Sequence, residues 1–158
     1  MGRGLYLVLV ALIFGALLLY GGNIGLMGKS TESPGFAVMR LDKSTYRIGE
    51  SLTLTITNTG VETLLVGDFY RLYRLENGEW KELNLGFSFT AIGYTIPPGG
   101  NWTQVVPLVT HLSAGAPGKL EPLPPGRYRI VKTVTIDRGR CGSRSDEITL
   151  SAEFEVVE

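Results

Sequence analysis

The residue types that most often carry out catalysis are scarce in this chain. Among its 158 residues there is one histidine, His111, and one cysteine, Cys141. A catalytic histidine needs a nucleophile or a carboxylate at hydrogen-bond distance, and the sequence contains no G-x-S-x-G or comparable nucleophile motif. His111 lies in a Pro- and Gly-rich stretch, where we expect an exposed loop histidine. We therefore predict no catalytic residues and a protein that is not an enzyme.

The metal-ligating side chains do not form a recognised pattern either. One histidine and one cysteine cannot complete a tetrahedral structural zinc site within a single chain. The carboxylates of Asp42, Asp68, Glu76 and Glu79 are scattered, and no D-x-D-x-D-G run of the calcium-loop type is present. We predict no metal and no cofactor, with calcium held between strand-end loops as the alternative.

Two positions are candidates for covalent modification. Cys141 lies among Arg138, Arg140 and Arg144, and cationic neighbours favour the reactive thiolate form. It is a candidate for an intermolecular thiol that joins two copies of the chain, and the alternative is an unpaired loop thiol without a role. Asn101 begins an N-x-T sequon just after a turn, which makes it a candidate for N-glycosylation in a host that glycosylates.

Two further features bear on binding. Trp80 and Trp102 fit core or corner packing better than an exposed aromatic patch for sugars. Residues 137–147 form a loop of mixed charge, which is most simply a solvated loop. A partner-contact loop is the alternative, because the end loops of β-sandwiches often carry recognition.

The N-terminal segment indicates on which side of the membrane these residues lie. No charged residue occurs between Arg3 and Lys29, and residues 5–27 form an apolar stretch of 23 residues. As a helix this stretch would be about 34 Å long, enough to cross the hydrocarbon core of a bilayer. We predict a hydrophobic helix within residues 1–30, a membrane partner through residues 5–27, and an exported domain over residues 31–158.

Three interpretations of this segment remain open. The first is an uncleaved signal anchor, with Arg3 favouring a cytoplasmic N-terminus. The second is a cleaved secretory peptide, for which Gly28-Lys29-Ser30 is a poor substitute for the usual A-x-A site. The third is a filament segment, because Arg3-Gly4 loosely resembles the processing site of archaeal pilins. The expected location is the cell membrane with an extracytoplasmic C-terminal domain, or a secreted or cell-surface protein if the segment is removed.

The composition of the exported part limits its partners. Two of the 15 basic residues, Arg3 and Lys29, precede it, which leaves 13 basic against 15 acidic residues. A net charge near −2 offers no electrostatic footprint for nucleic acid. About 128 residues suffice for one domain with its own core, and a single cysteine cannot form an internal disulfide.

The exported part has the alternation of β-strands. Ser51 to Thr57 alternates apolar and hydroxyl residues, and Glu147 to Val157 repeats the pattern over a longer span. We expect further strands at residues 36–41, 63–66, 69–75, 80–83, 88–96, 102–108 and 127–136. Asn77-Gly78 predicts a tight hairpin, and residues 97–100 a second turn. Residues 111–126 are expected to be irregular. Lys132 interrupts the inward set of its strand, and we interpret it as a bulge or an edge position.

One stretch carries a family resemblance. Leu123-Pro-Pro-Gly-Arg-Tyr128 resembles the segment that leads into strand F of immunoglobulin-like and fibronectin-III-like domains, where the tyrosine hydroxyl bonds back to the main chain. Residues 46–60 and 70–80 are similar to the bacterial immunoglobulin-like domains of exported proteins. The resemblance implies a structural tyrosine corner at Tyr128 and an all-β, immunoglobulin-like β-sandwich after the N-terminal hydrophobic helix.

The function that follows from these observations is binding. We expect a non-enzymatic, membrane-tethered module at the cell surface, with a structural, adhesive or protein-interaction role and with self-association or a protein partner. The alternative is a subunit of an extracellular, pilus-like filament assembled through its β-sandwich and N-terminal segment. Unpaired strand edges of an open sandwich provide one physical route to such assembly.

Overall fold

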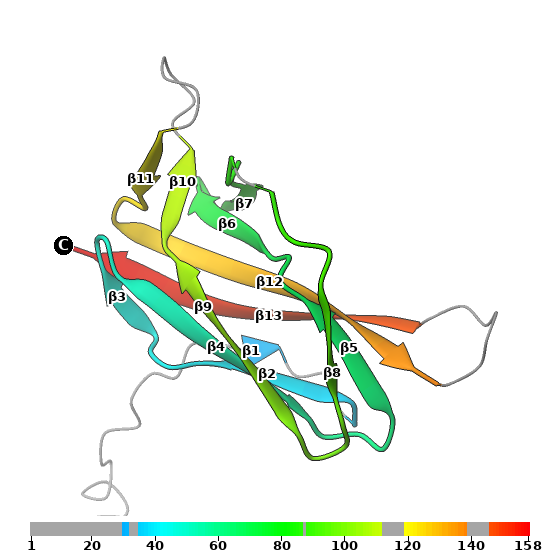
Figure 1. Ribbon diagram of the computed structural model, residues 1–158. Coiled ribbons are helices and arrows are strands. Elements are labelled where there is room, and N and C mark those ends of the chain that lie inside the picture. Colours follow the sequence, from blue (N-terminus) through cyan, green and yellow to red (C-terminus); the bar gives the residue numbers. More distant parts are fainter. Residues whose placement is uncertain (1–29, 32–34, 87, 112–118, 139–145) are drawn as a thin grey trace, which may run out of the picture.

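The computed structural model describes residues 30–31, 35–86, 88–111, 119–138 and 146–158, and these are all-β, with thirteen strands and no helix. The larger sheet has eight strands (Figure 1). They are β1 (Ser30–Thr31), β3 (Thr45–Arg47), β5 (Thr63–Gly67), β6 (Arg71–Glu76), β7 (Glu79–Glu82), β8 (Gly93–Ile96), β12 (Gly126–Asp137) and β13 (Asp146–Val157). The smaller sheet consists of β2 (Ala37–Leu41), β4 (Ser51–Asn58) and β9 (Asn101–Pro107), and β10 (Val109–His111) pairs with β11 (Leu120–Pro122).

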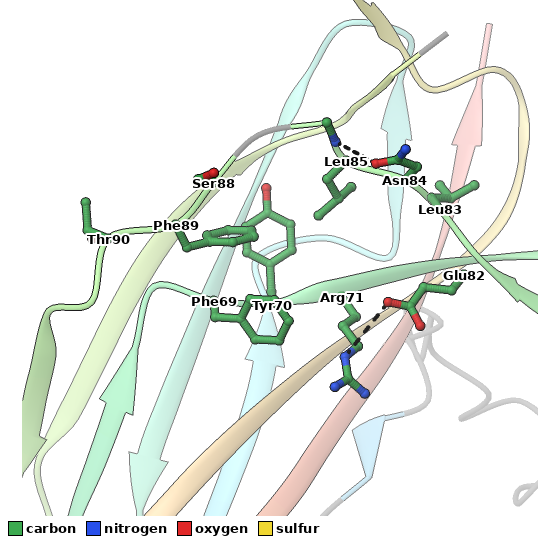
Figure 2. Close-up of a pocket in the computed structure, with 11 residues that line it drawn as sticks. Phe69, Tyr70, Arg71, Glu82, Leu83, Asn84, Leu85, Ser88, Phe89 and Thr90 are labelled. Atoms are coloured by element: carbon green, nitrogen blue, oxygen red, sulfur yellow. Dashed lines mark hydrogen bonds and ion pairs between the residues drawn. The ribbon is translucent and has the colours of Figure 1, made fainter. Parts of the chain in front are cut away.

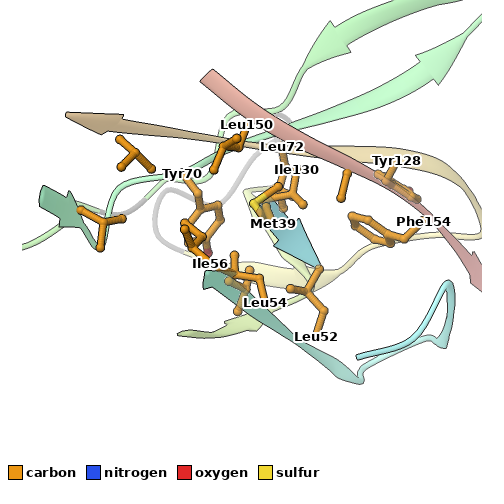
Figure 3. Close-up of a cluster of buried hydrophobic side chains, with 14 of the residues drawn as sticks. Met39, Leu52, Leu54, Ile56, Tyr70, Leu72, Tyr128, Ile130, Leu150 and Phe154 are labelled. Atoms are coloured by element: carbon orange, nitrogen blue, oxygen red, sulfur yellow. The ribbon is translucent and has the colours of Figure 1, made fainter. Parts of the chain in front are cut away.

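The two larger sheets pack face to face, as predicted for a sandwich, and the core lies between them (Figure 3). Alternation along the strands produces this core because successive side chains point to opposite faces of a sheet. Leu52, Leu54 and Ile56 of β4 are 0% exposed, and so is Leu150 of β13, which confirms the inward sets read from the sequence. Phe154 bridges two buried tyrosines, with its ring 5.6 Å from the ring of Tyr46 and 5.6 Å from that of Tyr128.

The two predicted turns are present. Glu76 pairs with Glu79, so the β6–β7 loop is the dipeptide Asn77-Gly78, and both of its residues have positive φ, at 51° and 85°. This is the backbone that favours Asn-Gly in two-residue hairpins. In the second turn, Gly100 N donates to Pro97 O at 2.8 Å, and Gly99 has a φ of 74°.

Other expectations were wrong. Of the strand predicted at residues 88–96, only Gly93–Ile96 is paired, and it pairs with β5. The stretch predicted to be irregular, residues 111–126, contains β11 and the last residue of β10, so His111 ends a strand and is half-buried instead of lying on an exposed loop. These short strands have no alternation of their own, because pairing with a neighbour, and not a buried face, holds them in place.

Some predictions fall outside the described residues. The predicted membrane helix at residues 5–27 and the thiol of Cys141 both lie there. Within the described ranges, the structure contains no helix with the length and apolar character needed to span a bilayer.

Candidate functional site

The large sheet contains a break that organises its surroundings. β5 and β6 both pair with β12, at Val134–Asp137 and at Tyr128–Val131 respectively. The three residues between them, Asp68-Phe69-Tyr70, leave the ladder. Tyr70 turns inward and is 3% exposed, whereas Phe69 turns outward and is 46% exposed. The break therefore places one aromatic ring in the core and the next on the surface.

Lys132 lies opposite this break and is 0% exposed. Its register with Leu150 of β13 is continuous, and β12 has partners on both sides, so the predicted bulge or edge position was wrong. The ammonium group donates to Gly67 O at 2.5 Å and to Gln104 Oε1 at 3.0 Å, and it lies 4.7 Å from the centre of the Trp102 ring. A lysine is accommodated here because it supplies a donor to a carbonyl group at the point where β5 ends.

Burial changes the acid–base behaviour of this lysine. Removal from water disfavours the charged ammonium and lowers the pKa of Lys132 to about 8, although the negative charge of Asp68 acts in the opposite direction. The same neighbourhood is tied together by hydrogen bonds. Gln104 Nε2 donates to Asp68 O at 2.8 Å, and Thr90 Oγ1 donates to Asp68 Oδ2 at 2.6 Å. Lys132 thus belongs to a network that reaches from the core to the surface segment at Thr90.

A pocket of about 630 Å³ opens beside the break, between the end of β7 and the start of β6 (Figure 2). Its lining combines aromatic and aliphatic side chains with groups that form hydrogen bonds. The lining residues are Phe69, Tyr70, Arg71, Glu82, Leu83, Asn84, Leu85, Gly86, Ser88, Phe89 and Thr90. Phe89 contacts both neighbouring rings edge to face, at 5.1 Å from the Phe69 ring and 4.9 Å from the Tyr70 ring.

The rim of this pocket is held by main-chain contacts. Asn84 O accepts hydrogen bonds from His111 N at 3.1 Å and Thr110 Oγ1 at 3.2 Å, and Asn84 Oδ1 accepts from Gly86 N at 3.0 Å. Gly86 has a φ of 67°, and a Cβ at this position would lie 2.7 Å from Cγ of His111. Glycine is required here both for the left-handed backbone and for the close approach of the histidine ring.

Two tyrosines fasten the ends of strands. The hydroxyl of Tyr128 donates to Pro124 O at 2.6 Å, which is the bond that a tyrosine corner consists of. The hydroxyl of Tyr46 donates to Asp42 Oδ1 at 2.7 Å, and the same carboxylate oxygen accepts from Thr53 N at 2.7 Å. Burial is the main reason why the pKa of each tyrosine is raised. Both hydroxyl groups are therefore engaged in holding the sandwich together.

Comparison with protein families agrees with this geometry. The model of the bacterial Ig-like domain matches residues 33–155. The chain belongs to the bacterial Ig-like domain family. This match bears out the resemblance seen in the sequence and covers nearly all of the described strands of the Ig-like domain.

Among solved structures, the Ig-like domain is similar to part of the Pseudomonas fluorescens alkylpurine DNA glycosylase AlkC bound to DNA containing an abasic site analogue, at 17% identity and a TM-score of 0.38 over 80% of this chain. It is also similar to part of the β-glucosidase from Listeria innocua in complexes with gluconolactone and with glucose, at 16% identity and a TM-score of 0.33 over 79% of this chain. The chain spans 32% of the first protein and 16% of the second, and such distant likenesses carry no argument about function. A search of curated proteins found no match.

The residues singled out from the sequence are not brought together. Asn101 is exposed at the start of β9, and its glycosylation stays a prediction. The Trp102 ring is half-buried and packs 5.7 Å from Tyr94, whereas Trp80 lies under the guanidinium of Arg129 at 4.1 Å. Within the described ranges no group of three His, Cys, Asp or Glu side chains is placed to hold a metal ion.

Sequence reasoning missed the pocket. Phe69 was assigned to a continuous strand, and Phe89 to another, so neither was expected to line a cavity. Lys132, a charged residue in an inward position, signalled only the neighbouring strand break, because such a residue requires polar groups opposite it, and it does not line the pocket.

Proposed function

We propose that this chain is a non-enzymatic, extracytoplasmic Ig-like module that is tethered to the membrane through residues 5–27. In this proposal the module acts at the cell surface in a structural, adhesive or protein-interaction role. The observation that carries the proposal is the order of its parts. An uncharged stretch of 23 residues directly precedes a domain that belongs to the bacterial Ig-like family.

The arrangement of the large sheet supports a tethered binding role. The chain enters the sandwich at β1, which pairs with β13 at one edge of the sheet. The pocket lies beside β6 and β7, on the far side of β12. At about 4.8 Å between neighbouring strands, β1 and β6 are roughly 14 Å apart across the sheet. A tether that enters at one edge leaves the opposite edge open to partners.

Three groups with altered pKa values have structural roles, and the fourth tyrosine or lysine of this kind, Tyr70, lines the pocket with a pKa that burial alone raises. The ammonium of Lys132 bonds to Gly67 O and Gln104, and the hydroxyls of Tyr46 and Tyr128 bond to neighbouring chain segments. Each of these groups has a structural partner that accounts for its position. Perturbed groups of this kind mark an active site only when they converge on a cavity with a reacting partner.

Location is tested on the full-length protein in its native cells. Intact cells are treated with a membrane-impermeant, lysine-reactive label and then with protease, and a cytosolic protein serves as the control. We expect labelling and cleavage of the Ig-like domain in intact cells, together with extraction by detergent only. Recovery of unlabelled protein in the cytosol would contradict the proposal.

A filament subunit remains the second candidate, and one observation favours it. Among the described residues, the outer strands of the small sheet, β2 and β9, each pair on one side only. Such edges accept a strand from another copy. Intact mass of the native protein separates the candidates, because loss of residues 1–4 favours a processed filament subunit and full retention favours the anchor.

A further inference from the structure

The pocket beside the strand break has the size of a small-molecule site. Its volume of about 630 Å³ lies within the range of 300–1,000 Å³ that is typical of ligand pockets. Two of its lining residues are bonded to other parts of the domain. Asn84 O accepts from His111 N and from Thr110 Oγ1, and Thr90 Oγ1 donates to Asp68 Oδ2.

The lining mixes apolar and polar groups (Figure 2). The Phe69 and Phe89 rings contact each other, and Phe69 remains 46% exposed, with the Arg71 guanidinium 5.6 Å from the centre of its ring. The polar residues Arg71, Glu82 and Asn84 are all exposed. A pocket for a purely apolar ligand would be lined mainly by hydrophobic side chains, with only a few polar groups. This mixture requires a ligand with apolar surface and many hydrogen-bonding groups.

The charges of the pocket balance each other. Arg71 Nε lies 3.9 Å from Glu82 Oε1, a separation longer than a direct hydrogen bond, and both side chains are about half exposed, at 51% and 55%. Glu82 Oε2 accepts from the Tyr73 hydroxyl at 3.3 Å, and the carboxylate retains further acceptor capacity, as the guanidinium retains donors. Because the two charges offset each other, the pocket has no net charge that would draw in an anion or a cation. A ligand with both donors and acceptors fits this lining.

A peptide is the main competitor for this site. An extended peptide gains affinity by pairing with an open strand edge. The second edge of β6 is occupied by β7, and that of β5 by β8, but the outer edge of β7 has no strand partner among the described residues. The test must therefore separate a ligand held by side chains in the pocket from a peptide.

We propose that this pocket binds a neutral saccharide unit. A sugar ring presents C–H groups on its faces, which suit the part of the Phe69 ring that remains exposed beside its contacts with Arg71 and Phe89. Its hydroxyl groups both donate and accept, which suits Arg71, Glu82 and Asn84. This inference deepens the proposed binding role by naming the ligand class, and it does not depend on how the chain reaches the cell surface.

The experiment uses the full-length chain in a detergent whose headgroup is not a sugar, such as an amine oxide. The protein is screened against an array of neutral glycans, and hits are confirmed with free oligosaccharides by saturation-transfer difference NMR and calorimetry. We expect saturation transfer to C–H protons of at least one neutral oligosaccharide. Phe69→Ala should weaken this binding at least tenfold.

Matched variants keep the test specific. Ile48→Ala removes a side chain that is 45% exposed, almost the same as Phe69, next to β3 at the other edge of the large sheet. It should bind like the wild type. Glu82→Gln preserves shape but removes the charge, and it tests the pocket even if Phe69→Ala does not fold, as judged by its thermal unfolding. We expect at least threefold weaker binding for Glu82→Gln.

Three outcomes would overturn the inference. The first is that no neutral glycan on the array binds. The second is that glycan binding is unchanged in both Phe69→Ala and Glu82→Gln. The third is that a displayed peptide binds, no glycan binds, and Phe69→Ala abolishes the peptide binding. The last would identify a peptide pocket. A cell-surface location found together with any of these results would leave the proposed function standing, so the two failures are distinguishable.

Discussion

Replacement of Lys132 by methionine tests whether burial lowers the pKa of this ammonium group as far as its surroundings indicate. Methionine retains a flexible chain of similar length but has no donor for Gly67 O or Gln104 Oε1, the two acceptors that Lys132 serves. Each acceptor left without a partner costs about 1–3 kcal/mol. Against this, the variant avoids the cost of burying a charge, so the balance between the two terms depends on pH.

The direction of the pH dependence follows from the lowered pKa of Lys132. This pKa falls from 10.5 to about 8 in the folded chain. Between these values the unfolded chain holds a proton that the folded chain has released, so the free energy of unfolding rises with pH across this window. At about 1.4 kcal/mol per pKa unit the full effect would be about 3 kcal/mol. Because the window from pH 7 to pH 10 ends below the pKa of 10.5 in the unfolded chain, we expect about 2 kcal/mol between these two pH values.

The assay is urea unfolding of the wild type, Lys132→Met and a control, Lys119→Met, at several pH values from 7 to 10. The side chain of Lys119 is 66% exposed, so the control removes a lysine from the surface and leaves the core unchanged. The wild type should gain about 2 kcal/mol over Lys132→Met as the pH rises from 7 to 10. A difference between these two proteins that stays constant over this range would refute the reasoning, because it would mean that the ammonium is not desolvated.

Three further predictions concern the remaining contacts. Tyr128→Phe removes the bond to Pro124 O and should lower the free energy of unfolding by about 1 kcal/mol, as measured by urea unfolding at pH 7. Gly86→Ala forces a side chain into a left-handed backbone and against the His111 ring, so a loss of about 2 kcal/mol or more is expected in the same assay, and an unchanged midpoint would contradict the geometry. Above pH 10 the wild type should lose stability, because burial raises the pKa of Tyr70 to about 12 and the unfolded chain ionises this tyrosine first; Tyr70→Phe should show a smaller loss in the same pH series.

Local sequence patterns were sufficient for the sandwich itself. Alternation in β4 and β13 predicted which side chains are buried, because successive side chains of a strand point to opposite faces of the sheet and only one face is buried. Asn77-Gly78 predicted its hairpin because few other residues adopt positive φ at both positions. The resemblance of the segment before Tyr128 to immunoglobulin-like domains implied the corner bond, which the Tyr128 hydroxyl makes to Pro124 O.

The candidate site could not be predicted in this way. The pocket is lined by Phe69, which lies between β5 and β6, and by Phe89, which lies between β7 and β8. The contact between the two rings depends on a strand break that no local sequence pattern marks. Lys132 looked like an exception in its strand because its partners, Gly67 and Gln104, are 65 and 28 residues away. The sequence by itself determined the long alternating strands and the two tight turns, since these depend on neighbouring residues. Only the tertiary structure decided where the buried charge finds its acceptors and where the surface is hollow, because both depend on which distant segments pack together.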